Sequence, residues 1–298
     1  MTYPVPTSLS PSRVESFTSC PLAFRFSSIE KLPEPPSPHA VKGTLVHRAL
    51  EVLLGLAPQE RTPAAAHACV EQAAVELREH EDPAERELAM LELSEEELAV
   101  FVADAHTLMD SYLTLEDPKA IAPSGLELRL EAQVGGLLMR GIIDRLEEDE
   151  DGQLVVTDYK TGRAPSIHYE QHRLGGVHFY AFLCEQALGR RPAVIRLMYL
   201  RDATIIEARP TERSARFLPK RTEAVWRAIS RACETGEFKP RPSRLCPSCA
   251  FQEWCPAFGG DPDRAAFEAP VRYGRGPVQL PLDVPAALPG SVDPALSA

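Results

Sequence analysis

Four cysteines place the strongest constraint on how this chain folds. Cys246, Cys249 and Cys255 form a C-x2-C-x5-C pattern near the C-terminus, and Cys20 lies 226 positions before Cys246. One inorganic centre bound to all four thiolates would tie the two ends of a domain together. By the loop-closure estimate used for disulfides, such a tie removes on the order of 5 kcal/mol of denatured-state entropy. The pattern therefore predicts a structural centre that joins distant segments.

The spacing alone does not say which centre the thiolates bind. Tetrahedral Zn²⁺ and iron-sulfur clusters both accept cysteine thiolates. The chain has seven cysteines, an odd number that favours metal ligation over disulfides in a reducing compartment. No apolar run is long enough to span a membrane, and the first residues lack a signal-peptide pattern. We therefore expect a cytoplasmic protein with no membrane contact.

Charge is distributed unevenly along the chain. The net charge is -11, but residues 190–244 hold 14 basic and 6 acidic side chains, whereas residues 51–118 hold 17 acidic and 3 basic ones. The basic segment would attract a polyanion such as DNA. An equally simple interpretation is that these charges cover solvated helix faces.

Hydrophobic periodicity predicts an α/β fold with a mixed central sheet. Strands are expected in LELRLEAQV, LLMRGIIDRLEE and QLVVTDYKTG, followed by a helix at 168–189, a strand pair at 193–210 and a long helix at 211–236. Residues 55–120 are expected to form an acidic helical insert in a domain that covers residues 1–259. Seven prolines in residues 260–298 predict a disordered tail.

Two of the predicted strands end in acidic residues. Asp144 ends GIID, and Asp158 and Lys160 share one face of the strand LVVTDYK. If these strands are neighbours in an antiparallel hairpin, both carboxylates can share one Mg²⁺ or Mn²⁺ ion, with Lys160 beside it. Acidic residues at hairpin ends are common without any metal. A lone helical histidine such as His47 is, likewise, more often structural than a ligand.

These motifs together resemble a known family. The order SxxxxFxxCPxxFRF, GTLVHRALE, RGIIDRLE, VTDYKTG, HFYAFL and CPSCAFQEWCPAF, over about residues 8–258, resembles the RecB-type branch of the PD-(D/E)xK nuclease superfamily in its iron-sulfur form. The chain is also similar to AddB-type and CRISPR-adaptation nucleases, which belong to the iron-sulfur form of this branch. The resemblance implies a restriction-endonuclease-like core with flanking helices and a 4Fe-4S clasp held by Cys20, Cys246, Cys249 and Cys255.

The resemblance also implies a catalytic site and a function. His47, Asp144, Asp158 and the carbonyl of Tyr159 match the metal ligands, Lys160 matches the catalytic lysine, and Tyr180 matches a tyrosine of the helix motif QxxxY. The implied activity is a Mg²⁺- or Mn²⁺-dependent DNA nuclease, an exonuclease acting on ends or single strands in repair or recombination, with a helicase as a partner from another chain.

The chain departs from the family at one position. Gly176 occupies the glutamine position of QxxxY. The departure leaves open an alternative function, a weakly active or inactive DNA-binding module of a helicase-nuclease or repair complex. In the tail, Gln279–Val284 resembles the peptides that bind the bacterial sliding clamp, although proline-leucine tails produce such strings by chance.

Overall fold

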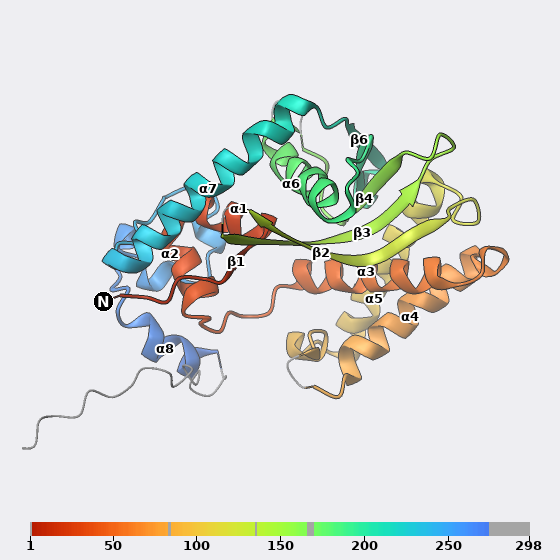
Figure 1. Ribbon diagram of the computed structural model, residues 1–298. Coiled ribbons are helices and arrows are strands. Elements are labelled where there is room, and N and C mark those ends of the chain that lie inside the picture. Colours follow the sequence, from red (N-terminus) through yellow and green to blue (C-terminus); the bar gives the residue numbers. More distant parts are fainter. Residues whose placement is uncertain (1, 83–84, 135, 166–169, 274–298) are drawn as a thin grey trace, which may run out of the picture.

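A mixed sheet forms the centre of the protein in the computed structural model, which describes residues 2–82, 85–134, 136–165 and 170–273 (Figure 1). Within these residues the sheet has six strands, in the order β1-β3-β4-β5-β6, with β2 also paired to β3. The strands are β1 (Ser8–Leu9), β2 (Pro123–Val134), β3 (Leu137–Glu148), β4 (Leu154–Lys160), β5 (Val194–Tyr199) and β6 (Thr204–Ala208). The predicted α/β class and mixed sheet are confirmed.

Along one edge, strand β3 pairs first with β1 and then with β4. β2 pairs with it antiparallel from Leu137 to Glu147. On the other edge, β1 runs parallel beside residues 138–139 and β4 runs antiparallel beside residues 145–148. Between these two contacts, residues 140–143 pair with β2 only among the described strands. The sheet therefore forks next to Asp144, and β4 continues beyond the fork in parallel pairing with β5.

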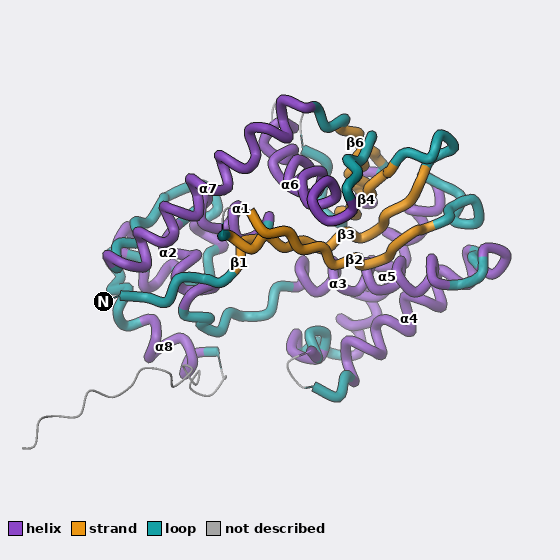
Figure 2. Tube along the Cα trace, in the orientation of Figure 1, coloured by secondary structure: helices purple, strands orange, loops and turns teal. Residues whose placement is uncertain are grey.

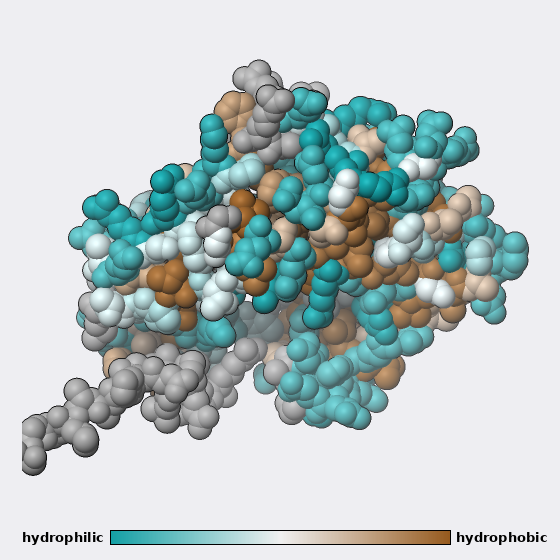
Figure 3. Space-filling model, viewed as in Figure 1, coloured by the Kyte–Doolittle hydropathy of each residue, from teal (hydrophilic) through white to brown (hydrophobic). Residues whose placement is uncertain are grey.

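Helices cover both faces of the sheet (Figure 1). One face carries α3 (Pro38–Gly55) and the two helices of the insert, α4 (Pro63–Glu79) and α5 (Glu95–Leu115). These three helices share a core with Tyr159, Met198 and Leu200. The opposite face carries α6 (Glu170–Leu188) and α7 (Glu212–Thr235), which pack in a second core with β3 and β4. On the face of the molecule shown in Figure 3, the outer surfaces of α7 and of the insert are largely hydrophilic.

The starts of the insert helices follow directly from the sequence. Ser37, Thr62 and Ser94 each accept a hydrogen bond from a backbone N–H of the first helical turn. Proline follows the first two caps, where its fixed φ suits the first helical position. Ser94 and Glu97 form a reciprocal capping box. These local signals are why the helices could be predicted.

Segments from the two ends of the chain lie side by side (Figure 2). The N-terminal segment contains α1 (Pro11–Ser19), α2 (Pro21–Phe24) and a π-helix at Arg25–Ile29. The Tyr3 N–H donates to the Cys233 carbonyl at 2.8 Å, and the rings of Phe26 and Phe251 lie 5.1 Å apart. These contacts hold the two segments together through protein atoms alone.

The prediction that residues after 259 lack a helix is wrong for α8 (Ala265–Arg272). Ala265 and Ala269 are fully buried, and the Trp254 indole N–H donates to Glu268 at 2.8 Å. Small residues four positions apart let the helix pack closely against neighbouring side chains, despite Pro270. Residues 274–298, including Gln279–Val284, lie outside the described residues. None of the described helices has the length and apolar character needed to cross a membrane.

Candidate active site

The fork in the sheet brings Asp144, Asp158 and Lys160 together. Arg145 pairs with Thr157, so Asp144 and Asp158 occupy the next positions, where β3 and β4 separate. The Tyr159 N–H donates to Asp144 Oδ2 at 2.7 Å, so this carboxylate replaces the main-chain acceptor that β3 no longer supplies. Lys160 Nζ forms an ion pair with Asp158 Oδ2. The predicted antiparallel arrangement of the two acidic strand ends is therefore present.

Helix α3 brings His47 to the same place. His47 Nε2 lies 3.0 Å from the Tyr159 carbonyl oxygen, and Nδ1 lies 3.6 Å from Asp144 Oδ2. The imidazole ring packs edge-to-face against the Tyr159 ring, with centroids 6.0 Å apart. His47 thus contacts both the carboxylate and the carbonyl that the family resemblance implies as metal ligands.

Glu127 also lies at this site, and the sequence reasoning missed it. One ligand atom each from His47, Glu127 and Asp144 lie within 4.8 Å of one another. Glu127 sits on β2 with φ of 44°, a left-handed backbone conformation that is uncommon for a non-glycine residue. This irregularity lies across from the fork. It is not visible in LELRLE, where Glu127 looks like an ordinary polar position of an alternating strand.

The electrostatics of the site reflect burial of several charges. Burial and the Asp158 charge raise the pKa of Asp144 to about 7, although His47, the Tyr159 N–H and Lys160 oppose this rise. Burial, together with the charges of Glu51 and Asp158, raises the pKa of Glu127. Burial disfavours the charged form of Lys160, but the Asp158 carboxylate outweighs it and raises the pKa of this amine. Lys160 therefore stays a cation beside a concentration of carboxylates.

Helix α6 closes the site from the other face of the sheet. A Cβ at Gly141 would lie 2.6 Å from a methyl carbon of Leu183 and 3.4 Å from the Tyr180 ring, so a side chain here would require Leu183 to move. Burial, followed by the charges of Asp158, Asp144 and Glu127, raises the pKa of the Tyr180 phenol. Gly176 lies one turn before Tyr180 in the same helix.

The three cysteines of the C-x2-C-x5-C pattern and Cys20 come together at the junction of the chain ends. Cys20 lies between α1 and α2. Cys246 begins one 3₁₀ turn, and Cys249 and Cys255 each directly follow a 3₁₀ turn. Burial raises the pKa of the Cys249 thiol, as do the neighbouring Cys20, Cys246 and Cys255. Backbone N–H groups of Arg241 and Ser243 point at the Cys20 and Cys246 sulfurs, at 3.5 and 3.2 Å.

Comparison with known proteins identifies the fold. A family model of the PD-(D/E)XK nuclease superfamily matches residues 8–256. The chain belongs to this superfamily. A provisionally named exonuclease from Eubacterium rectale has a solved structure that is 12% identical, with a TM-score of 0.50 over 82% of this chain and 87% of that chain. A solved structure of a protein called SSO0001 is 17% identical, with a TM-score of 0.35 over 73% and 97%. A search of curated proteins found no match.

The basic segment of this chain, residues 190–244, is only partly free to attract a polyanion. Arg190, Arg191 and Arg196 form ion pairs with glutamates, so part of the positive charge in residues 190–244 is locally neutralised. Helix α7 presents a further set of exposed basic side chains, which are Lys220, Arg221, Arg227 and Arg231. Burial and then Arg221 lower the pKa of His178 on α6, so α7 contributes positive charge close to the helix that carries Tyr180.

The buried carboxyl of Asp144 makes the stability of this PD-(D/E)XK domain depend on pH. Its pKa of about 7 exceeds the ordinary value of 3.8, so between pH 4 and 7 the folded protein holds a proton that the unfolded chain releases. Stability therefore falls as pH rises through this window. Asp144→Asn removes this titrating group. With a chelator present, the melting temperature of the variant relative to wild type should therefore rise by at least about 3 °C between pH 4 and pH 7.

Differential scanning fluorimetry at half-unit pH steps measures this difference. Asp151→Asn, at an exposed turn position, is the matched control and should give a difference that does not change with pH. A constant difference for Asp144→Asn as well would contradict the raised pKa.

Proposed function

We propose that this chain is a metal-dependent deoxyribonuclease of the RecB-type, iron-sulfur branch, acting as an exonuclease on DNA ends or single strands. The observation that carries the proposal is the convergence of His47, Glu127 and Asp144 beside the Asp158–Lys160 ion pair. Burying the Asp158 carboxylate beside a half-exposed lysine and three further ionisable groups is costly for stability alone. Such groups are typical of catalytic sites.

The donor set fits a hard divalent cation. Carboxylate oxygens of Glu127, Asp144 and Asp158, the Tyr159 carbonyl and one imidazole nitrogen would hold Mg²⁺ or Mn²⁺, which favour oxygen ligands. When bound, the cation supplies charge stabilisation for the phosphate and lowers the pKa of water. With a pKa of about 7, Asp144 must lose a proton before it can serve as a ligand near neutral pH, and burial raises the pKa of Glu127 as well.

Lys160 and Tyr180 supply groups that need no metal. The Lys160 ammonium is held beside Asp158 as a cation and can donate hydrogen bonds to a water molecule or to a phosphate oxygen. The Tyr180 phenol is kept protonated by burial and by the surrounding carboxylates, so it remains a hydrogen-bond donor. The exposed basic side chains of α7 would bind the DNA backbone without regard to sequence.

The four-cysteine site is proposed to bind a 4Fe-4S cluster. Thiolates bind both tetrahedral zinc and iron-sulfur clusters. The resemblance to the iron-sulfur branch favours a 4Fe-4S cluster over zinc at Cys20, Cys246, Cys249 and Cys255. The N–H groups directed at Cys20 and Cys246 would stabilise thiolate charge there.

Calorimetry and nuclease assays test the catalytic proposal together. Anaerobically purified protein should bind Mn²⁺ and degrade DNA with free ends, and Asp144→Ala and Glu127→Gln should each weaken Mn²⁺ binding at least about tenfold because each removes a ligand. Glu131→Gln, four positions from Glu127 on β2 and exposed, should leave binding unchanged. Wild-type protein that neither binds Mn²⁺ nor degrades DNA would refute the proposal.

Gly176 favours a second candidate function, a DNA-binding module with little or no activity. Mn²⁺ binding and DNA binding without hydrolysis would support this second candidate. A helicase from another chain is proposed as a partner in repair or recombination, in the cytoplasm. Binding of a sliding clamp through Gln279–Val284 stays a prediction from the sequence.

A further inference from the structure

Tyr159 connects several parts of the candidate active site. Its N–H donates to Asp144 and its carbonyl oxygen lies 3.0 Å from His47 Nε2, so the two peptide groups of one residue contact two candidate metal ligands. Its side chain points to the other face of β4, where only 2% of the residue is exposed. The orientation of this side chain therefore influences the positions of both His47 and Asp144.

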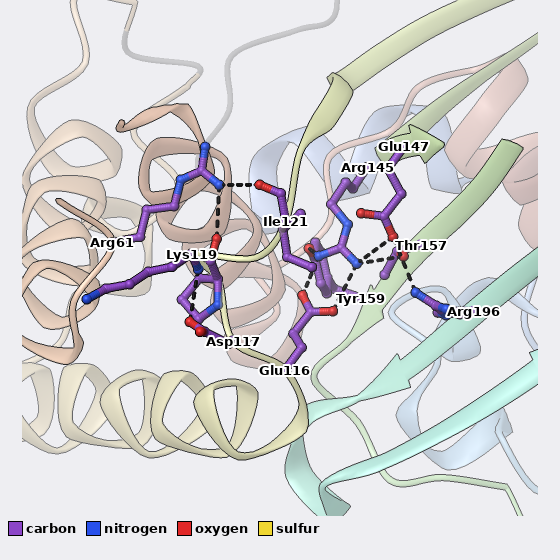
Figure 4. A network of polar contacts seen from close by, with 11 residues as sticks. Arg61, Glu116, Asp117, Lys119, Ile121, Arg145, Glu147, Thr157, Tyr159 and Arg196 are labelled. Carbon is purple, nitrogen blue, oxygen red and sulfur yellow. Dashed lines mark hydrogen bonds and ion pairs between the residues drawn. The ribbon is translucent and has the colours of Figure 1, made fainter. Parts of the chain in front are cut away.

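Arg145 fixes the hydroxyl end of that side chain. Arg145 Nη1 donates to the Tyr159 hydroxyl at 3.0 Å, and Nη2 donates to Thr157 Oγ1 at 3.1 Å. The Arg145 side chain is fully buried, and both of its terminal nitrogens bind the Glu116 carboxylate (Figure 4). A buried guanidinium with bidentate pairing has little rotational freedom, so it can hold the hydroxyl in one place.

Glu116 joins this network to the helical insert. It is the C-terminal cap of α5, and the chain just beyond it is held by Arg61, whose Nη1 donates to the carbonyls of Pro118 and Ile121 at 3.0 and 2.7 Å (Figure 4). Arg61 is itself buried. The end of the insert is thus rigidly placed against the face of the sheet opposite to α6.

We infer that Glu116 and Arg145 are positioning residues, which act through the Tyr159 hydroxyl to hold His47 and Asp144 at the spacing that a divalent cation requires. A buried ion pair is weak evidence for stability, since apolar residues of similar volume often serve as well. Its position directly behind the candidate ligands gives it another use, because groups that orient metal ligands control metal affinity. The inference rests on the proposed function, and it makes the helical insert part of the catalytic apparatus.

Tyr159→Phe tests the inference because it removes only the hydroxyl and keeps the buried ring. We expect Mn²⁺ affinity to fall about tenfold, with a lower kcat and an unchanged KM for DNA. Glu116→Gln should act in the same direction, and the double variant should lose less than the product of the two single effects, because both act through one path. Isothermal titration calorimetry gives the affinities, and thermal melts establish that each variant is folded.

Thr157→Val is the matched control. It removes another hydrogen bond to Arg145 from the same strand but leaves the Tyr159 hydroxyl in place. If the network is purely structural, Tyr159→Phe and Thr157→Val should lower the melting temperature by similar amounts, and both variants should keep wild-type Mn²⁺ affinity. That result would overturn the inference and leave the proposed function standing. Failure of wild type itself to bind Mn²⁺ would instead remove the proposed function, and the inference with it.

Discussion

Replacing Lys160 with methionine is expected to slow DNA hydrolysis by about a hundred- to a thousandfold, the usual cost of losing one preorganised donor at a reacting group. Mn²⁺ binding should survive, because Lys160 competes with the cation for the charge of Asp158 and supplies no ligand. Single-turnover cleavage of an end-labelled duplex and of a single strand measures the rate, and calorimetry measures the affinity.

Lys42→Met is a close control for this variant. Lys42 also forms a lysine–aspartate ion pair, with Asp104 at 2.7 Å, but that pair joins α3 to α5 outside the active site. Its loss should leave the single-turnover rate within about twofold of wild type, as a surface pair contributes little. Equal rates for Lys160→Met and Lys42→Met would show that Lys160 has no part in the chemistry.

Replacing Cys249 with serine is expected to lower the melting temperature by about 10 to 20 °C. The proposed centre closes a loop of more than two hundred residues, so its loss returns on the order of 5 kcal/mol of entropy to the unfolded chain. Wild-type protein purified without oxygen should be brown, and the Cys249→Ser variant should be colourless. Melting curves and visible absorption, combined with iron and zinc analysis, check both parts.

Cys69→Ala provides the control for the loss of a buried thiol. Cys69 lies in the core between α3, α4 and α5, away from the four-cysteine site. This variant should keep its colour and most of its stability. A colourless wild-type protein with one zinc per chain would contradict the cluster, although a zinc centre could still tie the segments together.

The parts of the fold that the sequence predicted are those set by local signals. Serine or threonine caps mark the insert helices, and alternation marks β2, β3 and β4. Strand β1 could not be predicted, because two residues carry no periodicity and its pairing with β3 depends on contacts more than 120 positions away. Helix α8 was missed because its two buried alanines gain meaning only from the tertiary packing around them.

The candidate site divides in the same way. Asp144, Asp158 and Lys160 follow apolar strands, and His47 lies on an amphipathic helix, so their types and spacing could be interpreted. Glu127 depends on an unusual backbone angle beside the fork, which no residue type reveals. Arg145 looked like one charge among several in RLEE, and its complete burial becomes apparent only when α5 is placed against the sheet.

The meeting of both chain ends in one core affects how this protein is made. Contacts such as Phe26 with Phe251 cannot form until the ribosome has synthesised almost the whole described chain. At about 5 to 20 residues per second, the N-terminal aromatic side chains wait on the order of 10 to 45 s for their partners. During translation, chaperones therefore have a long interval in which to bind the exposed first segment, and the proposed cluster could be assembled only after it.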